Sequence, residues 1–179
     1  MTHVCARAAL VLALGLGAIA AAQAQSPEPA PRPRSTMRQL MQSIVFINAN
    51  VVFSAQTVDP ASVPRDARSA LSTNPLTGLY GGWQAIENSS LALIDAADLL
   101  NTPGRVCASG RPVPIQENDW QAAVVALRAA AVTSAEAARA RSQDRIFAAA
   151  DELTEACSRC HRVYRTRDNP CVDLRPPSP

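Results

Sequence analysis

The stretch that decides the fold lies near the C-terminus and reads SQDRIFAAADELTEACSRCHRVY, residues 142–164. Its apolar and small side chains recur every three or four positions, which is the period of one face of an α-helix. We therefore expect a helix that starts near Ser142. The residues expected on its apolar face are Ile146, Ala150, Leu153, Cys157, Cys160 and Tyr164.

Three earlier segments show the same period, at about residues 36–56, 83–100 and 120–140. The second stops before Pro103 and Gly104, which are typical of a helix end. The apolar positions of the first are Met37, Leu40, Met41, Ile44, Ile47, Val51 and Val52, with Asn48 among them. Expected N-terminal caps are Ser35 or Thr36 for the first segment and Asn118 or Asp119 for the third.

No segment alternates apolar and polar residues long enough to predict a sheet. Four helices of this length with mostly short connections favour an all-α fold, an antiparallel four-helix bundle over residues 36–170. The connection at 57–82 is long for such a bundle and has no assignment. Residues 171–179 are expected to form a C-terminal tail.

The N-terminus has the pattern of a secretory signal peptide. One positive charge at Arg7 precedes an apolar run over residues 8–22, and Ala22-Gln23-Ala24 offers a cleavage site. A retained membrane anchor is the alternative, although the run is short for a bilayer span. We expect residues 1–24 to be removed near Ala24 and the mature chain to be periplasmic, with the alternating prolines of residues 25–35 as a linker.

Charge and cysteine content narrow the function classes. All 17 basic residues are Arg and 15 residues are acidic, a near balance that gives no reason to expect nucleic acid as a partner. Cys5 is lost with the leader, which leaves Cys107, Cys157, Cys160 and Cys171 in an oxidising compartment.

Cys157-Ser-Arg-Cys160-His161 has the spacing of covalent haem attachment. Two thiols three positions apart on a helix can bind both vinyl groups of one haem, and the adjacent His161 can ligate the iron. The expected cofactor is therefore one haem c. The alternatives are a thioredoxin-like redox pair, which is typical of a helix N-terminus, a zinc site, which needs more ligands than the mature chain offers, and a structural disulfide.

With this motif in its last helix, the chain resembles the class II c-type cytochromes, the cytochrome c′ family and its low-spin relatives. These are four-helix bundles with the haem motif near the C-terminus. The resemblance is carried by residues 157–165 (CSRCHRVYR), 38–41 (RQLM), 97–105 (ADLLNTPGR) and 119–120 (DW). The chain departs from the family in the long 57–82 connection and in the extra pair Cys107 and Cys171.

A second axial ligand normally comes from His, Met or Lys, and the mature chain offers only Met37 and Met41. In an up-down bundle the start of the first helix lies at the same end as the motif. The low-spin members of the family place their ligand where Met41 stands, so Met41 is the expected ligand and Met37 the second choice. Alternatively, both only fill the core. Further expected haem contacts are Met37, Leu40, Ile44, Tyr164 and Arg165.

The leading functional hypothesis is one-electron transfer at His/Met-ligated iron. The alternative is a five-coordinate site that binds NO or CO. An enzyme such as a peroxidase is not expected, because no distal His or other acid-base pair is available. Expected partners are redox proteins or a small gas ligand. The mature chain is expected to have no membrane span. The sequence does not decide between a monomer and a homodimer.

Cys107 and Cys171 are predicted to form a disulfide. The connection that follows the second helix and the end of the fourth helix lie at the same end of an up-down bundle, and exported thiols that meet are usually oxidised. The alternative is two separate thiols, one of them joined to a second molecule.

Overall fold

The computed structural model describes residues 32–65, 80–165 and 171, which belong to one compact unit, Pro31–Pro179. The predicted leader, the linker before residue 32 and the tail beyond Cys171 lie outside the described residues. So do residues 66–79, the middle of the long connection.

The described residues form helices and no strand, which confirms the all-α prediction for this part of the chain. The only ladder-type pairing among them is an isolated bridge between Val106 and Pro112. The helices are α1 (Met37–Leu40), the π-helix η1 (Met41–Val45), α2 (Phe46–Ser54), the 3₁₀-helix η2 (Pro60–Ser62), α3 (Gly82–Leu100), α4 (Asn118–Arg139) and α5 (Gln143–Tyr164).

Three of the four long helices begin and end within two residues of their predicted positions. The first segment differs, because a π turn interrupts the regular helix that its apolar pattern predicts. The predicted cap of α4 is also wrong: Asn118 and Asp119 are already helical, and the N-cap is Glu117. A turn closed by the bond from the Glu117 amide to the Pro114 carbonyl places Glu117 at this position.

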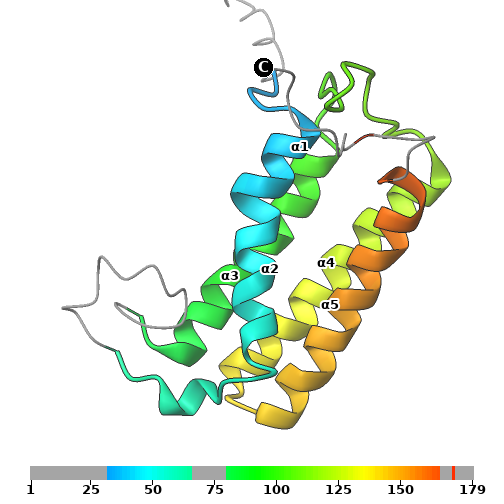
Figure 1. Ribbon diagram of the computed structural model, residues 1–179. Helices are drawn as coiled ribbons and strands as arrows, with labels where there is room; N and C mark the ends of the chain where they lie inside the picture. The colour runs from blue at the N-terminus through cyan, green and yellow to red at the C-terminus, as the bar shows by residue number, and fades with distance from the viewer. Residues whose placement is uncertain (1–31, 66–79, 166–170, 172–179) are drawn as a thin grey trace, which may run out of the picture. The chain divides into compact units, whose positions relative to one another are not determined.

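The helices lie side by side, with α4 packed against both α3 and α5 and with α2 packed against α3 (Figure 1). Contact between α2 and α5 is much less extensive. The core is filled by large apolar side chains of facing helices, such as Ile86, Leu93, Ile146 and Leu153, all fully buried. Buried alanines of α4 allow close contact with the neighbouring helices.

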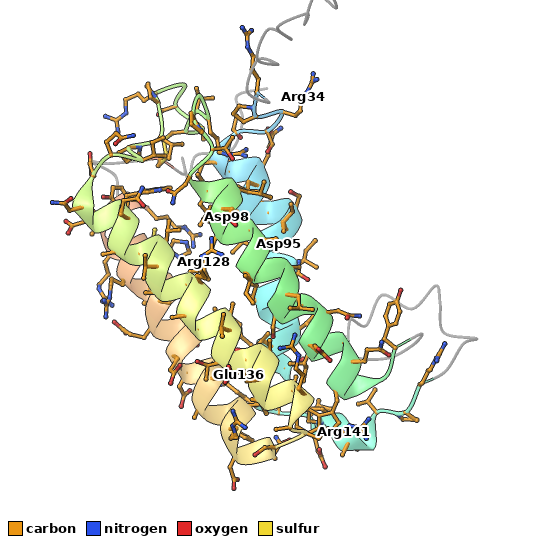
Figure 2. All side chains as sticks on the ribbon, turned by 180° about the vertical axis from the view of Figure 1, so that it is seen from behind. Arg34, Asp95, Asp98, Arg128, Glu136 and Arg141 are labelled. Atoms are coloured by element: carbon orange, nitrogen blue, oxygen red, sulfur yellow. A yellow bond between two sulfur atoms is a disulfide. The ribbon has the colours of Figure 1, made fainter. Side chains whose placement is uncertain are left out.

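Ion pairs join neighbouring helices on the outside of this core. Arg128 of α4 pairs with Asp98 of α3, both labelled in Figure 2. Arg139 Nε lies 2.7 Å from Glu87 Oε1, again between α4 and α3. Since these side chains are partly exposed, each pair contributes at most about 1 kcal/mol, and burial of apolar surface dominates stability.

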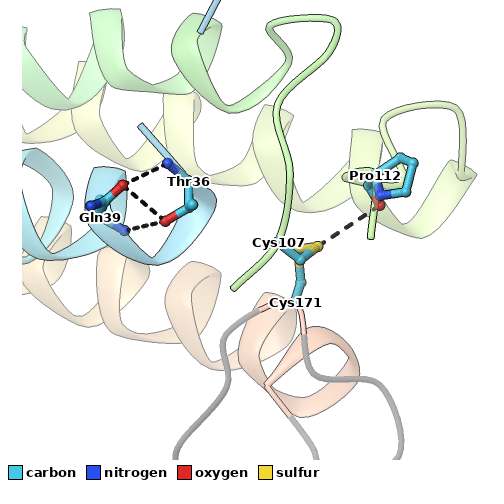
Figure 3. The surroundings of a disulfide bond; sticks show 5 residues. All are labelled: Thr36, Gln39, Cys107, Pro112 and Cys171. Carbon is cyan, nitrogen blue, oxygen red and sulfur yellow. Dashed lines mark hydrogen bonds between the residues drawn. A yellow bond between two sulfur atoms is a disulfide. The ribbon is translucent and has the colours of Figure 1, made fainter. Parts of the chain in front are cut away.

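Thr36 starts the first helical segment with a capping box. The Gln39 amide donates to Thr36 Oγ1 at 3.3 Å, and the Thr36 amide donates to Gln39 Oε1 at 2.9 Å (Figure 3). The side chain of Arg105, only 5% exposed, donates from Nη1 to the Ser35 carbonyl at 2.6 Å. The start of α1 is therefore held against the loop that follows α3.

A disulfide joins Cys107 in that loop to Cys171, with Cα atoms 4.4 Å apart (Figure 3). This is the pair that the sequence analysis expected to meet. The Cys171 amide also donates to the Tyr164 carbonyl at 3.1 Å, and the Ala108 amide donates to the Cys171 carbonyl at 3.1 Å. The α3–α4 loop is thus fastened to the C-terminal end of α5.

The described ends of the 57–82 connection pack against the start of α3, where the Gly82 amide donates to the Val63 carbonyl at 2.9 Å. Asp59 caps η2 through a 2.9 Å bond from the Ala61 amide. Pro60 is fully buried against Gly82, where an added Cβ would collide with the Pro60 carbonyl. Only glycine therefore fits at the first position of α3. None of the described helices combines the length and apolarity that crossing a membrane needs.

Candidate functional site

A cavity of about 470 Å³ lies where the first helical segment faces α4 and α5. This volume is in the usual range for a small-molecule or cofactor site. Most of the wall is hydrocarbon. The sulfur-bearing groups come from two elements, the first helical segment and α5. The wall residues are Arg38, Met41, Gln42, Val45, Phe46, Ala49, Phe53, Leu100, Trp120, Ala123, Val124, Leu127, Ala156, Cys157, Cys160, His161 and Arg165.

Helix α5 contributes Cys157, Cys160 and His161 to this wall. Their spacing of three and four residues places them on one helix face. All three side chains are half-buried, and the two thiols are not joined by a disulfide. The site therefore presents two thiols and one imidazole to an apolar space.

Burial sets the protonation of these groups. Desolvation raises the pKa of Cys157 above its usual value, and desolvation together with the neighbouring Cys157 raises the pKa of Cys160 to about 11. Desolvation, and secondly the charge of Arg165, lowers the pKa of His161. At neutral pH the thiols are therefore protonated, and the imidazole is neutral with a lone pair available for a metal.

Met41 of η1 lines the same cavity as the α5 groups. Met37 does not: it is 1% exposed and lies in the core beside the fully covered Leu40. Ile44 is half-buried and packs against the core outside the wall. Of the two methionines that sequence reasoning offered as ligands, the structure brings only Met41 to the cysteines.

Tyr164 lies at the end of α5, outside the cavity wall, and is 3% exposed. Its hydroxyl donates to Glu117 Oε2 at 2.8 Å, and its ring meets Trp120 edge-on at 5.0 Å between centroids. Trp120 forms part of the wall, and its Nε1 donates to Asn101 Oδ1 at 3.1 Å. Tyr164 thus supports the wall from behind through Trp120.

Arg165, predicted as a haem contact, is exposed at the cavity. Arg38, the second residue of the first helical segment, lies on the wall as well. Two guanidinium groups therefore border a space that is otherwise apolar. Such groups suit the carboxylates of an amphipathic cofactor.

Sequence reasoning missed the wall that α4 supplies. Trp120, Ala123, Val124 and Leu127 follow one another at the three- and four-residue spacing of a single helix face. That spacing was visible in the sequence, but it predicts only a buried face and not what the face is buried against. Phe46 and Phe53 of α2 were missed for the same reason.

Two alternatives to haem attachment fit these surroundings poorly. A zinc site needs about four ligands, and no group of three or more His, Cys, Asp and Glu side chains converges as a metal site within residues 32–65, 80–165 and 171. A reactive redox pair needs thiols with a lowered pKa at a helix N-terminus. Here the pKa values are raised and the thiols lie near a helix C-terminus.

Comparison of the chain with protein-family models, curated proteins and solved structures finds no match.

Proposed function

We propose that this chain is a periplasmic c-type cytochrome of the four-helix-bundle kind, which carries single electrons with one covalently bound haem. One observation carries the proposal: two free thiols and an imidazole on α5, and a thioether on η1, border the same apolar cavity. This donor set matches what covalent haem with two axial ligands requires.

Cys157 and Cys160 would hold the cofactor. Each S–H would add across one vinyl group, with sulfur bonding to one carbon and hydrogen to the other, so that no oxidant is consumed. The raised pKa values of both thiols favour this S–H form at neutral pH. His161 follows Cys160 directly, so the same anchor that holds the ring would bring the imidazole to the iron.

Haem iron, when bound, supplies a one-electron redox centre. The chain's own residues would control its surroundings. Val45, Ala49 and Leu127 line part of the cavity with hydrocarbon, while Arg38 and Arg165 would pair with the propionates. Met41 as the second axial ligand would raise the reduction potential and fix the coordination sphere, which suits electron transfer with a redox partner protein.

The second candidate function is binding of NO or CO at five-coordinate iron. It is favoured by the α4 wall, where Ala123, Val124 and Leu127 present only hydrocarbon to the cavity. An apolar diatomic gas needs no hydrogen-bonding group there. The two functions differ in one respect, whether Met41 occupies the sixth position.

An optical spectrum of the oxidised and reduced full chain, produced together with a haem-attachment system, tests the proposal. We expect covalent haem with low-spin spectra in both states and the weak far-red band of an iron–methionine bond in the oxidised state. High-spin spectra would overturn electron transfer in favour of gas binding. A chain that acquires no covalent haem would overturn both.

A further inference from the structure

The first helical segment has an irregularity where it reaches the cavity. Helices α1 and α2 continue one another, but between them η1 closes with a bond from the Phe46 amide to the Met41 carbonyl, five residues apart. An α-helical turn closes over four residues. The π turn Met41–Val45 therefore holds one residue more than the α-helix would, as single π turns at functional sites often do.

One added residue changes which way Met41 faces. In an unbroken α-helix, side chains at i, i+4, i+7 and i+11 form one row, so Met41 would share a row with Val45, Asn48 and Val52. Val52 is fully buried in the core, and Asn48 donates to its own helix at the Ile44 carbonyl. Apart from Val45, this row does not face the cavity.

With the added residue, the part of the helix before the π turn is rotated by roughly one residue, about 100° at 3.6 residues per turn. Met41 then aligns as residue 42 of a regular helix would, in the row of Phe46, Ala49 and Phe53. All three of these residues form the cavity wall, as does Met41.

We infer that the π turn Met41–Val45 positions the second axial ligand of the iron. It adds one residue to the helix and thereby turns the Met41 thioether from the row of Asn48 and Val52 to the row of Ala49 and Phe53, which lines the cavity. The inference rests on the proposed function, since it assigns a role in iron ligation to this turn. It adds that the length of the turn, and not only the residue at position 41, decides ligation.

Ser43 lies in the turn, is exposed and forms no part of the cavity wall. Its deletion leaves four residues from Met41 to Val45, the number that a regular helical turn needs. Met41 then stays in the row of Phe46, Ala49 and Phe53. An alanine inserted after Ser43 adds a second extra residue and rotates Met41 by about another 100°. The deletion is therefore expected to keep Met41 at the cavity, and the insertion is expected to turn Met41 away from it.

The test uses the haem-loaded full chain in five forms: wild type, deletion of Ser43, alanine inserted after Ser43, Ser43→Ala as the equal-length control, and deletion of Asn50. Asn50 is also exposed and polar, but it lies in the regular part of α2. The readouts are the far-red iron–methionine band, CO binding by the reduced protein, and the midpoint of thermal unfolding followed by circular dichroism.

We expect the Ser43 deletion and Ser43→Ala to keep the band, to exclude CO as the wild type does, and to melt within a few degrees of it. The insertion is expected to lose the band and bind CO, and the Asn50 deletion is expected to melt clearly lower. Loss of the band on Ser43 deletion, its survival in the insertion variant, or high-spin haem in the wild type would overturn the inference.

Failure of haem attachment itself gives a different result, because the wild type would then carry no covalent haem. The thermal comparison still tests, in that case, whether the π turn holds one extra residue. If the two deletions lower the midpoint of thermal unfolding equally, Ser43 is not an extra residue and the inference is wrong. If only the Asn50 deletion lowers it, the length argument holds and the ligation role alone is lost.

Discussion

At the scale of single residues, Met37 and Met41 show how two identical side chains one helical turn apart come to have different surroundings. Met37 is almost completely buried in the core, and Met41 is half-buried on the cavity wall. The sequence placed both on one helix face, because an i, i+4 pair shares a face in a regular helix. They keep this relation here, because the Met41 amide bonds to the Met37 carbonyl. Met37 lies one turn nearer the α3–α4 loop, where its amide donates to the Val106 carbonyl at 2.8 Å, a contact that the apolar pattern does not encode.

Met41→Ala is expected to convert low-spin haem to five-coordinate, high-spin haem that binds CO, because no other described methionine reaches the cavity wall. Met37→Ala is the matched control. It is expected to keep the low-spin spectrum while lowering the free energy of unfolding by about 2–5 kcal/mol, the usual cost of emptying a buried methionine site. Optical spectra and urea unfolding measure both effects. An unchanged spectrum in Met41→Ala would remove Met41 as ligand.

Tyr164 predicts an alkaline pH dependence of stability. Burial first, then the hydrogen bond to Glu117, raises the pKa of the Tyr164 hydroxyl above its usual value of 10.0. Above pH 10 the unfolded chain therefore loses a proton that the folded chain keeps, so the free energy of unfolding falls as pH rises.

Tyr164→Phe removes this titration, and its stability is expected to fall less between pH 9 and pH 11 than that of the wild type. At neutral pH the variant is expected to lose about 1 kcal/mol with the hydrogen bond. Urea unfolding at several pH values measures both quantities. Parallel pH profiles for the two proteins would show that Tyr164 does not carry the effect.

At the scale of helices and loops, the positions of α3, α4 and α5 could be predicted closely because each combines a long 3.6-residue period with a clear end signal. Pro103 and Gly104 follow α3, and Ser142 caps α5 by accepting from the Arg145 amide at 3.4 Å. The cap of α4 could not be predicted in this way. Asn118 is the better capping residue in general, but the turn before it places Glu117 at the N-cap, where its carboxylate also accepts from Tyr164.

The Cys107–Cys171 bridge is an element-scale feature, because it fastens the α3–α4 loop to the end of α5. Its removal by Cys107→Ser with Cys171→Ser opens a loop with a sequence separation of 64. The chain-entropy model gives about 4 kcal/mol of lost stability. This figure is an upper limit, because covalent haem would already cross-link part of this loop and native-like structure in the unfolded chain would restrict it further.

Urea unfolding of the double variant against the wild type measures this loss, and peptide mapping of the non-reduced protein shows whether residues 107 and 171 are joined. We expect a lower midpoint with the absorption spectrum retained, because neither cysteine belongs to the cavity wall. Free thiols at both positions in the wild type would contradict the bridge.

At the scale of the whole described unit, the cavity depends on topology. Met41 and Cys157 are far apart in sequence, and they meet because the first helical segment starts at the end where α5 finishes (Figure 1). The sequence predicted this meeting from the up-down order of four helices. It did not predict the wall of α4 and α2, because the space between helices follows from how closely each pair packs, and α2 has little contact with α5.

The central claim is that Cys157 and Cys160 hold a haem covalently, and haem staining of a denaturing gel combined with intact-protein mass tests it most directly. The full chain is produced with a haem-attachment system, beside Cys157→Ser with Cys160→Ser as the matched variant. We predict that the wild type stains and gains the mass of one haem, while the double variant does neither. A wild type without stain or added mass, or a double variant that still stains, would contradict the account.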